Sequence, residues 1–540
     1  MKSKLSLLLC FLWLYHELTA QSYFVWSPLD SNLVFTGVAA HCIRGGLNER
    51  ANKLVAINYI DNKNDKQGFC LMNFSEIDDI SSGLKCQLTA ESPIITKILS
   101  GNGAYFFLLG TVKTDNWGSY PFLATYDARL KRIVAAKLFT PSQGNNQNFE
   151  LVDAVFSNDK YYLLLKTQVE YLGNMNDKIM VICYDGNVIE WSYIYNTTAP
   201  IHSESAMNIA IDPNDHVAVA GTIKAAGDPY ERMMLGEISK SGEAIQLKRI
   251  ELFAPNQAYS HRYGKTFLHS RLTNLHLFAQ SIIGRSEPGP LLVTMFDINY
   301  ALRTWRDYAM PIRVENSLVS REFFLFGGQA PVEAGFKAYT LSRINSTNAI
   351  VEAVRLFEKG VDNFSPATTS ANCYDDQFDK VWTFIKDNDS IVNDLLVIEN
   401  DGNLDHVCST KLESSVAKDT IKIHEIAFSA KPYEFMLSDL RFEVEELPSQ
   451  LNKICGTTHI SALDKQKRIK ATYDPYTHCI EFENDILFER MVIHDIMGHQ
   501  IISSYMTFGQ LNCTLVPGVY TLFGMSTHGI PYLGKITVAY

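Results

Sequence analysis

The sequence lacks the cysteine spacing, long apolar runs and basic blocks that mark several common classes of protein. Its ten cysteines include no Cys-x-x-Cys pair, so neither a zinc site of ordinary spacing nor a disulfide framework is supported. No segment beyond the N-terminal region reaches the ~18 apolar residues of a transmembrane helix. The net charge is -11 with no block of lysine and arginine, which argues against nucleic acid as a partner.

Common catalytic motifs are absent as well. There is no Gly-x-Ser-x-Gly elbow, phosphate loop or dinucleotide fingerprint. His494 and His499 superficially match a metalloprotease zinc motif, but they stand five residues apart on a predicted strand and turn and would not share a helix face. Cys42 follows His41 directly, and neighbours on a strand point to opposite faces, which argues against a Cys-His nucleophile pair. We therefore predict no catalytic, cofactor-binding or metal-binding residue.

What is present is typical of a folded, exported β protein. Hydrophobic residues make up 46% of the chain and charged residues 20%, and the 26 tyrosines and 30 phenylalanines favour strands over helices. At 540 residues we expect two or three folded units. Lys2 and Lys4 precede an apolar run at residues 5–14, and small residues follow at 18–20. This pattern predicts a signal peptide over residues 1–20.

Cleavage of this signal would remove Cys10 and leave nine cysteines. That is an odd number, so at least one thiol is unpaired or pairs between chains. Cys70 with Cys86, or Cys373 with Cys408, could form a disulfide, and the spacing does not decide between them. We expect Cys42 to be buried or disulfide-bonded.

Strand-like runs recur about every 55 residues between positions 50 and 400. The shortest step between unit starts is 48 residues (275 to 323) and the longest is 59 (216 to 275). Hairpins in the middle of each unit, such as Asp185-Gly186, recur with the same shortened step. The unit starts are Leu54, Ala104, Tyr161, His216, Leu275, Phe323 and Val381.

Seven units of four short strands predict an all-β fold with a seven-bladed β-propeller over residues 21–450. Residues 217–220 are continuously apolar, as in a strand covered on both faces, whereas residues 188–193 alternate as an outer strand does. Two β-sandwich domains are the alternative. The propeller requires Tyr161 and Val217 to lie in equivalent strands of neighbouring sheets.

Closure of the ring leaves two options open. Residues 23–26 and 32–35 could supply strands to the last blade, or residues 421–428 and 440–444 could complete it. The acidic residues 443–448 end in a proline and are interpreted as the exit from the propeller, with a linker over residues 451–470.

Two kinds of binding site are considered for the propeller. Asp375, Asp376 and Asp379, residues 387–389 and residues 61–65 supply clustered oxygen atoms that could hold Ca²⁺, although Asp and Asn are also the preferred turn residues. Aromatic-rich segments at 115–120 and 256–263 could bind a ligand.

The hairpin at Asp185 does not complete the Asp box of sialidase propellers. Cys183, Asn187 and Glu190 stand where that motif requires Ser, Gly and Trp. Catalysis of the sialidase type is therefore not predicted.

Residues 471–540 contain short alternating runs separated by Gly and Pro, which predicts a small Ig-like antiparallel β-sandwich. Asp495-x-x-Gly498 marks a turn between two strands, and Leu515-x-x-Gly518-x-Tyr520 precedes the final strands. With these motifs the segment resembles the type A C-terminal sorting domain of cargo proteins of the bacterial type IX secretion system. The resemblance implies a partner in the secretion machinery, and a product that is secreted or held at the outer cell surface.

Three functions remain open at this point. The first is a non-enzymatic propeller that binds a glycan, a peptide or a cell-surface protein. The second is a hydrolase or lyase that acts on polysaccharide or peptide, with carboxylates from several blades converging on one face. The third is a purely structural role.

Overall fold

The computed structural model describes the strands named below, and many of the turns that join them, within residues 23–455 and 468–538. The chain divides into two compact units, and residues 21–455 form the larger one. Within the described residues we find no helix with the length and apolar character needed to cross a membrane.

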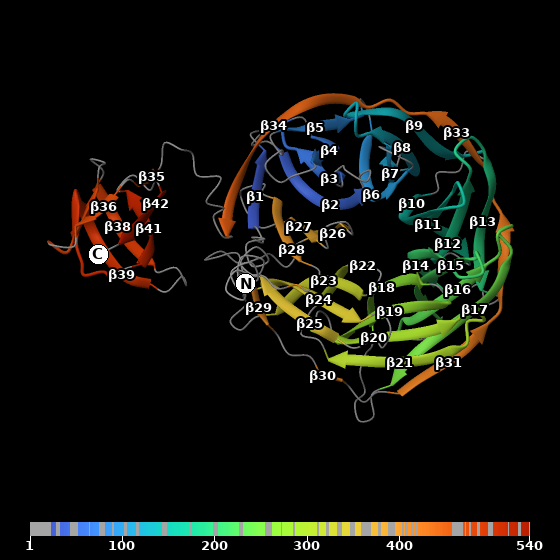
Figure 1. Cartoon of the computed structure of the whole chain (residues 1–540). Coiled ribbons are helices and arrows are strands. Elements are labelled where there is room, and N and C mark those ends of the chain that lie inside the picture. Colours follow the sequence, from blue (N-terminus) through green and yellow to red (C-terminus); the bar gives the residue numbers. More distant parts are fainter. Residues whose placement is uncertain are drawn as a thin grey trace, which may run out of the picture. The chain divides into compact units, whose positions relative to one another are not determined.

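The larger unit is a ring of seven antiparallel blades, which is a seven-bladed β-propeller (Figure 1). The first three blades each use four consecutive strands. Blade 1 has β2 (Leu33–Ile43), β3 (Asn52–Asp61), β4 (Lys66–Phe74) and β5 (Ser82–Gln87); blade 2 has β6 (Ser92–Ser100), β7 (Tyr105–Lys113), β8 (Ser119–Asp127) and β9 (Arg132–Pro141); blade 3 has β10 (Phe149–Ser157), β11 (Lys160–Tyr171), β12 (Asn174–Tyr184) and β13 (Ile189–Thr197).

The remaining blades follow the same order, except that the last takes its fourth strand from the N-terminal region. Blade 4 has β14 (Ser203–Ile211), β15 (Val217–Lys224), β16 (Arg232–Ile238) and β17 (Ala244–Phe253); blade 5 has β18 (Arg262–Arg271), β19 (Asn274–Ile283), β20 (Glu287–Asp297) and β21 (Leu302–Ala309); blade 6 has β22 (Arg313–Val319), β23 (Phe323–Pro331), β24 (Lys337–Asn345) and β25 (Val351–Phe357); blade 7 has β26 (Thr369–Asp375), β27 (Lys380–Lys386), β28 (Leu395–Asp401) and β1 (Tyr23–Pro28).

The propeller prediction is therefore confirmed, and the sandwich alternative is wrong for this region. Tyr161 lies in β11 and Val217 in β15, which are the second strands of neighbouring blades. The predicted unit boundary was displaced by one strand, because each of the recurring unit starts marks the second strand of a blade. The innermost strands are less continuously apolar, since they border the centre of the ring, and so they gave a weaker signal.

Two contacts close the ring between the last and first blades. Residues 23–26 pair with β28, as predicted, whereas residues 33–35 instead begin the first blade. A disulfide joins Cys42 on the innermost strand of blade 1 to Cys373 on the innermost strand of blade 7. The suggested partner Cys408 is thus wrong for Cys373, and Cys86 carries no disulfide.

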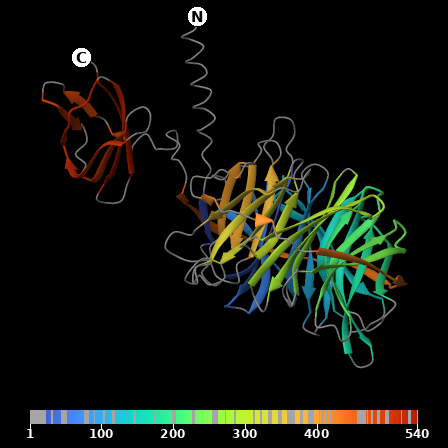
Figure 2. The ribbon, with the colours of Figure 1, turned by 90° about the horizontal axis from the view of Figure 1, so that it is seen from below.

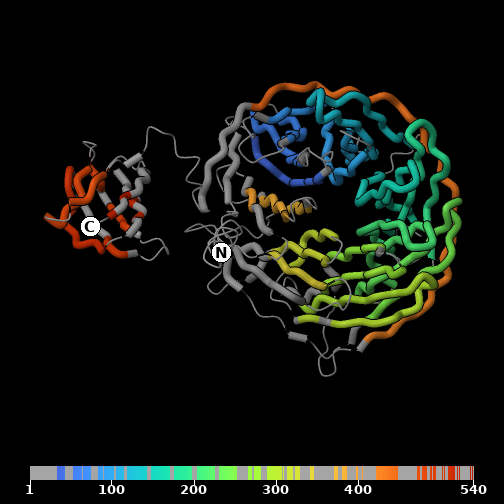
Figure 3. Tube along the Cα trace, in the orientation of Figure 1, coloured from blue at the N-terminus to red at the C-terminus, as the bar shows by residue number. Residues whose placement is uncertain are grey.

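A belt of six strands surrounds the outside of the propeller, and nothing in the sequence pattern predicted it. The belt, residues 409–455, is drawn in orange in Figure 1, part of it is also orange in Figure 3, and Figure 2 shows the ring from its side. It runs around the ring against blade order, so that each of its strands lies antiparallel to the fourth strand of one blade. Its strands are β29 (Ser409–Lys411) on blade 6, β30 (Ser415–Val416) on blade 5, β31 (Thr420–Ile426) on blade 4, β32 (Phe428–Pro432) on blade 3, β33 (Phe435–Asp439) on blade 2 and β34 (Glu443–Cys455) on blades 1 and 7.

The belt also fills the outer ends of the grooves between blades. Within residues 421–443, the belt side chains largely alternate between exposed and partly buried, as expected for a strand with one face on the core. Phe442 places its ring 5.3 Å from Phe69 of blade 1 and 5.7 Å from Phe122 of blade 2. Phe428 stacks on Tyr195 of blade 3 at 5.3 Å. The belt therefore adds both hydrogen bonds and apolar contacts to the ring.

Three earlier interpretations are corrected by the belt. Residues 421–428 and 440–444 do not complete the last blade but belong to the belt. Residues 443–448 are not an exit linker, because β34 bonds to β5 of blade 1 through Glu443–Pro448 and to β1 through Ser449–Cys455. A strand with alternating polar and apolar residues has the same sequence pattern whether it pairs with the next strand in the chain or with a distant blade.

The smaller unit contains two sheets around a core of its own, as predicted for a small sandwich. One sheet has the order β35 (Arg468–Ile469), β42 (Pro531–Val538), β41 (Gly518–Ser526), β38 (Leu487–His494) and β39 (Gln500–Phe508); the other has β36 (Ala471–Asp474), β37 (Cys479–Phe482) and β40 (Gln510–Asn512). All pairs are antiparallel except β35 with β42.

Replacement of Phe442 by alanine should destabilise the propeller by about 2–3 kcal/mol, because a ring packed between two blades is lost. The matched control is Met436→Ala on the same belt, where the side chain is 54% exposed and the cost should stay below about 0.5 kcal/mol. Denaturant unfolding of both variants checks this. Equal losses of stability in the two variants would show that the inward-facing side chains of the belt do not hold the blades together.

Candidate functional site

The innermost strands of blades 1 to 6 each carry a β-bulge near the same level of the ring. A bulge redirects a side chain and interrupts strand pairing, and it often occurs beside functional sites. The bulges lie between Phe35 and Gly37, Ile95 and Lys97, Leu151 and Asp153, Ala206 and Asn208, Tyr263 and Thr266, and Val314 and Asn316.

Glycine is required opposite three of these bulges. A Cβ atom on Gly221 would lie 2.1 Å from the carbonyl oxygen of Ser205, which is closer than any real contact. Gly110 and Gly328 occupy the equivalent positions and would meet carbonyl oxygens at 2.0 and 2.1 Å. The second strand can approach the bulged strand in these blades only because it has no side chain there.

Polar side chains on the second strands connect three of these bulges to the preceding blade. In each case the acceptor binds the backbone N–H of the residue just before the bulge. These bonds are Ile95 N to Asn58 Oδ1 at 2.7 Å, Leu151 N to Thr111 Oγ1 at 2.9 Å and Val314 N to Gln280 Oε1 at 2.7 Å.

Asp153 is the centre of the polar contacts between blades 2, 3 and 4. One of its carboxylate oxygens lies 2.8 Å from the Lys97 ammonium of blade 2. The other accepts hydrogen bonds from Asn208 Nδ2 and from the backbone N–H of Ile209, both in blade 4. Asn208 then accepts the N–H of Leu268 from blade 5 at 2.7 Å.

We call these contacts between the innermost parts of neighbouring blades the inner rim. Further polar contacts continue the inner rim around the propeller. Lys265 donates to the carbonyl of Glu315, and His269 Nε2 lies 3.0 Å from Ser317 Oγ, which joins blades 5 and 6. Asn316 of blade 6 bonds to both Ser370 and Asn372 of blade 7. Blades 7 and 1 are joined by the Cys42–Cys373 disulfide. Every pair of neighbouring blades is thus tied at the inner rim.

Lys97 is close enough to two histidines to affect their ionisation. Burial and then the Lys97 charge lower the pKa of His41 to about 4, and burial, Lys97 and His276 lower the pKa of His269 to about 3. Both rings are therefore neutral at pH 7 and supply no further positive charge to this rim.

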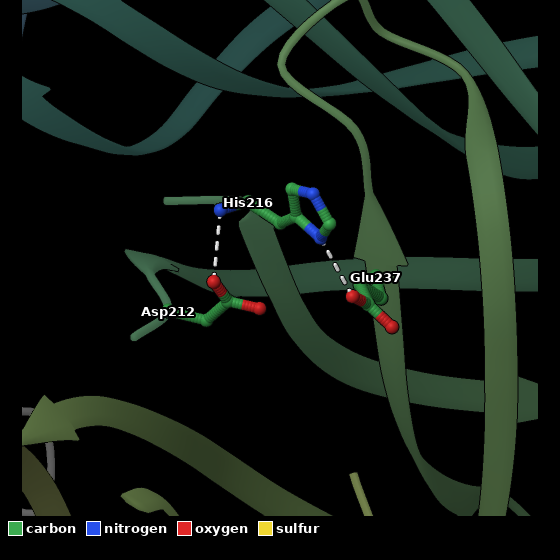
Figure 4. A group of neighbouring side chains, drawn as sticks. All are labelled: Asp212, His216 and Glu237. Carbon is green, nitrogen blue, oxygen red and sulfur yellow. Dashed lines mark hydrogen bonds and ion pairs between the residues drawn. The ribbon is translucent and has the colours of Figure 1, made fainter. Parts of the chain in front are cut away.

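Asp212, His216 and Glu237 form the single group with metal-ligand geometry among the residues that the structure describes (Figure 4). Asp212 and His216 flank the turn between β14 and β15, and Glu237 lies on β16. His216 Nδ1 lies 2.7 Å from Glu237 Oε1. Asp212 Oδ1 accepts the N–H groups of Asn214 and His216, each at 2.8 Å, and its other oxygen accepts the hydroxyl of Tyr300 at 3.0 Å.

These bonds do not fit a metal site. A cation would have to displace the turn hydrogen bonds of Asp212 and the contact between His216 and Glu237. Burial raises the pKa of Asp212, which opposes its charged, ligating form. Asp185 and Asp297 cap other hairpins through the same pattern of two backbone N–H bonds. The group is therefore a turn cap.

Of the three predicted calcium positions, the structure describes only the turn that begins at Asp61. Asp61 accepts the N–H of Lys63 with one oxygen and pairs with the Lys85 ammonium through the other, each at 3.0 Å. A carboxylate bound in this way already has a cation. The side chain of Asp375, together with Asp376, Asp379 and residues 387–389, lies outside the described residues.

The aromatic segments proposed as binding loops are described only at their edges. Tyr120 packs against the hydrophobic cores on both sides of blade 2, so it is a structural residue. Residues 115–117 and 256–261 lie outside the described residues. The first segment joins the second strand of blade 2 to its third strand, and the second segment joins the fourth strand of blade 4 to the first strand of blade 5.

Three of the five predicted sorting-motif residues take part in the sandwich itself. Leu515 is buried, and Gly518 begins β41. The hydroxyl of Tyr520 donates to the carbonyl of Val516 at 2.8 Å, an arrangement like the tyrosine corner of immunoglobulin-type sandwiches. Asp495 and Gly498 lie outside the described residues, between the paired strands β38 and β39.

Comparison with known proteins gives a likeness to two propeller enzymes of known structure. No protein-family model and no curated protein matches the chain. Trypanosoma rangeli sialidase in complex with the inhibitor DANA is 9% identical, with a TM-score of 0.33 over 59% of this chain and 56% of the sialidase chain. Native Bacillus subtilis arabinanase Arb43A is 10% identical, with a TM-score of 0.27 over 56% of this chain and 92% of that chain. The order of the seven sheets, rather than these scores, identifies the propeller here.

Replacement of Asp153 by alanine should destabilise the propeller by about 2–3 kcal/mol, since the Asn208 and Ile209 donors would lose their acceptor. Asp439→Ala is the control, because Asp439 also pairs with a lysine at 2.6 Å but is 79% exposed. That variant should unfold at the same midpoint as the parent chain. A stable Asp153→Ala variant would mean that this carboxylate is kept for a reason other than holding the blades together.

Proposed function

We propose that this chain is an exported β-propeller that works outside the cell as a binding module rather than as an enzyme. The main support is that charged groups lining the ring are already engaged in structural hydrogen bonds and ion pairs. Asp153 and Asp212 have their carboxylate oxygens engaged in bonds between blades or within turns. Glycoside hydrolysis needs two carboxylates about 5–10 Å apart that can exchange protons or bond with the substrate. Carboxylates whose oxygens are held in such bonds are suited to a rigid scaffold rather than to catalysis.

A glycan is the ligand that the surface chemistry favours. The guanidinium carbon of Arg232 lies over the half-buried Tyr230 ring, 5.0 Å from its centroid, which sets a hydrogen-bond donor beside an aromatic ring. Aromatic rings beside hydrogen-bond donors suit sugars, because one face of a sugar ring is apolar and its edge is polar.

Export through the type IX system is the second part of the proposal. Residues 456–540 form a compact unit apart from the propeller, and their Leu-x-x-Gly-x-Tyr motif is built into a tyrosine corner. The last strand of the belt ends at Cys455, so removal of the tail would leave every blade and the whole belt intact.

Deletion of residues 456–540 should retain the propeller inside a bacterium that has the type IX system, whereas the full chain should reach the surface or the medium. Surface proteolysis and immunoblotting of the medium measure this. Equal export of the two chains would contradict the assigned role of the tail.

A glycan array probed with the full chain should give binding to a defined group of polysaccharides without any release of reducing sugar. A blank array would contradict the binding function. Release of reducing sugar from any bound glycan would favour the hydrolase instead.

A further inference from the structure

Tyr105, at the start of β7 in blade 2, is the one phenylalanine, tyrosine or tryptophan with an exposed side chain among the residues that the structure describes. Its side chain is 43% exposed. It makes no hydrogen bond and no ring contact with a described residue. The Tyr230 ring, by contrast, is half-buried beneath Arg232. The Tyr105 ring is therefore available to a ligand.

Two charged residues continue a row from Tyr105 across blade 2. Tyr105 is the direct cross-strand neighbour of Asp127 on β8, and Asp127 is the direct neighbour of Arg132 on β9. Direct neighbours in antiparallel strands point to the same face of the sheet, with their Cβ atoms about 5 Å apart. These three residues, which we call the blade 2 row, thus extend over about 10 Å, or two strand spacings.

The two charged members of the blade 2 row differ in their surroundings. Asp127 is buried, and its Oδ1 accepts the N–H groups of Arg129 at 2.8 Å and Leu130 at 3.0 Å. Arg132 is exposed, and its guanidinium has no hydrogen bond or ion pair with a described residue. Arg132 can therefore donate to a ligand, while Asp127 places a balancing negative charge between Arg132 and the Tyr105 ring.

Aromatic rings where blades 2 and 3 meet hold the blade 2 row in position. Phe107 lies two residues along β7 from Tyr105 and so on the same face of the strand. Its ring centroid is 4.8 Å from that of Tyr161 and 5.8 Å from that of Phe156, both in blade 3. Phe107 and Phe156 also pack against the hydrophobic core between the two blades. Because β7 is fixed in this way, a ligand on Tyr105 would have little of the protein to order.

We propose that Tyr105 and Arg132 bind a sugar residue of a neutral polysaccharide. One face of a sugar ring is apolar and stacks on an aromatic ring, and the hydroxyl groups at its edge accept hydrogen bonds from a guanidinium. The negative charge of Asp127 beside both groups disfavours an anionic sugar. This inference rests on the proposed glycan-binding function and names its ligand class and site.

The test measures binding of the full chain to three immobilised neutral polysaccharides, laminarin, galactomannan and dextran, and to the acidic polymer polygalacturonate. We expect binding to at least one neutral polysaccharide that does not weaken as salt increases. Tyr105→Ala should weaken that binding about tenfold, because the stacking contact is lost. Arg132→Gln should weaken it about fivefold. Tyr105→Phe keeps the ring and should change binding less than about twofold.

Two control variants match these changes at other places on the propeller. Ile298→Ala removes an apolar side chain that is 40% exposed at a hairpin of blade 5, and Lys431→Gln removes an exposed cation of the belt. Neither control should change binding more than about twofold, and all five variants should keep the melting temperature of the parent chain.

Glycan binding that Tyr105→Ala and Arg132→Gln leave intact would refute this site but not the binding function. Equal weakening by the row and control variants would also overturn the site. Arg129 and Lys131 are exposed on the same turn, so tighter, salt-sensitive binding to polygalacturonate would overturn the neutral ligand class. The absence of binding to every polysaccharide would refute both the site and the binding function.

Discussion

The antiparallel pairing between the belt and the fourth strand of every blade is the constraint on which the rest of the propeller depends. A four-stranded blade leaves the edge of its outer strand exposed, and exposed edges invite pairing with other chains. Here one continuous segment covers part or all of each edge, and it can be antiparallel throughout only because it runs around the ring against blade order. Its last strand also joins the first blade to the last.

A second set of contacts holds the same blades from the inside. The polar bonds around Asp153, Asn208 and Asn316, together with the Cys42–Cys373 disulfide, connect neighbouring blades at the inner rim. Blades fixed at both radii leave little freedom for movement between them. Such a body suits a rigid surface on which side chains keep their positions.

The blades could be predicted from sequence, and the belt could not. A blade is local: its strands are joined by short hairpins, so the 55-residue period and turn residues such as Asp185 identify it directly. The belt contacts join residues hundreds of positions apart, such as Lys137 and Asp439, which are separated by 302 positions, and an alternating strand does not indicate its partner. The sequence indicates the inner-rim contacts only weakly, through the polar residues Asn58, Thr111 and Gln280 at matching positions in apolar strands.

The most direct measurement compares cooperative unfolding of residues 21–455 with that of residues 21–408, which contain all seven blades but no belt. Near-ultraviolet circular dichroism during thermal unfolding reports the packing of aromatic residues in the blades. The account predicts that loss of the belt lowers the midpoint by more than about 10 °C and broadens the transition, since every blade loses its outer partner. An unchanged midpoint and cooperativity would show that the blades are stable without the belt and would contradict the account.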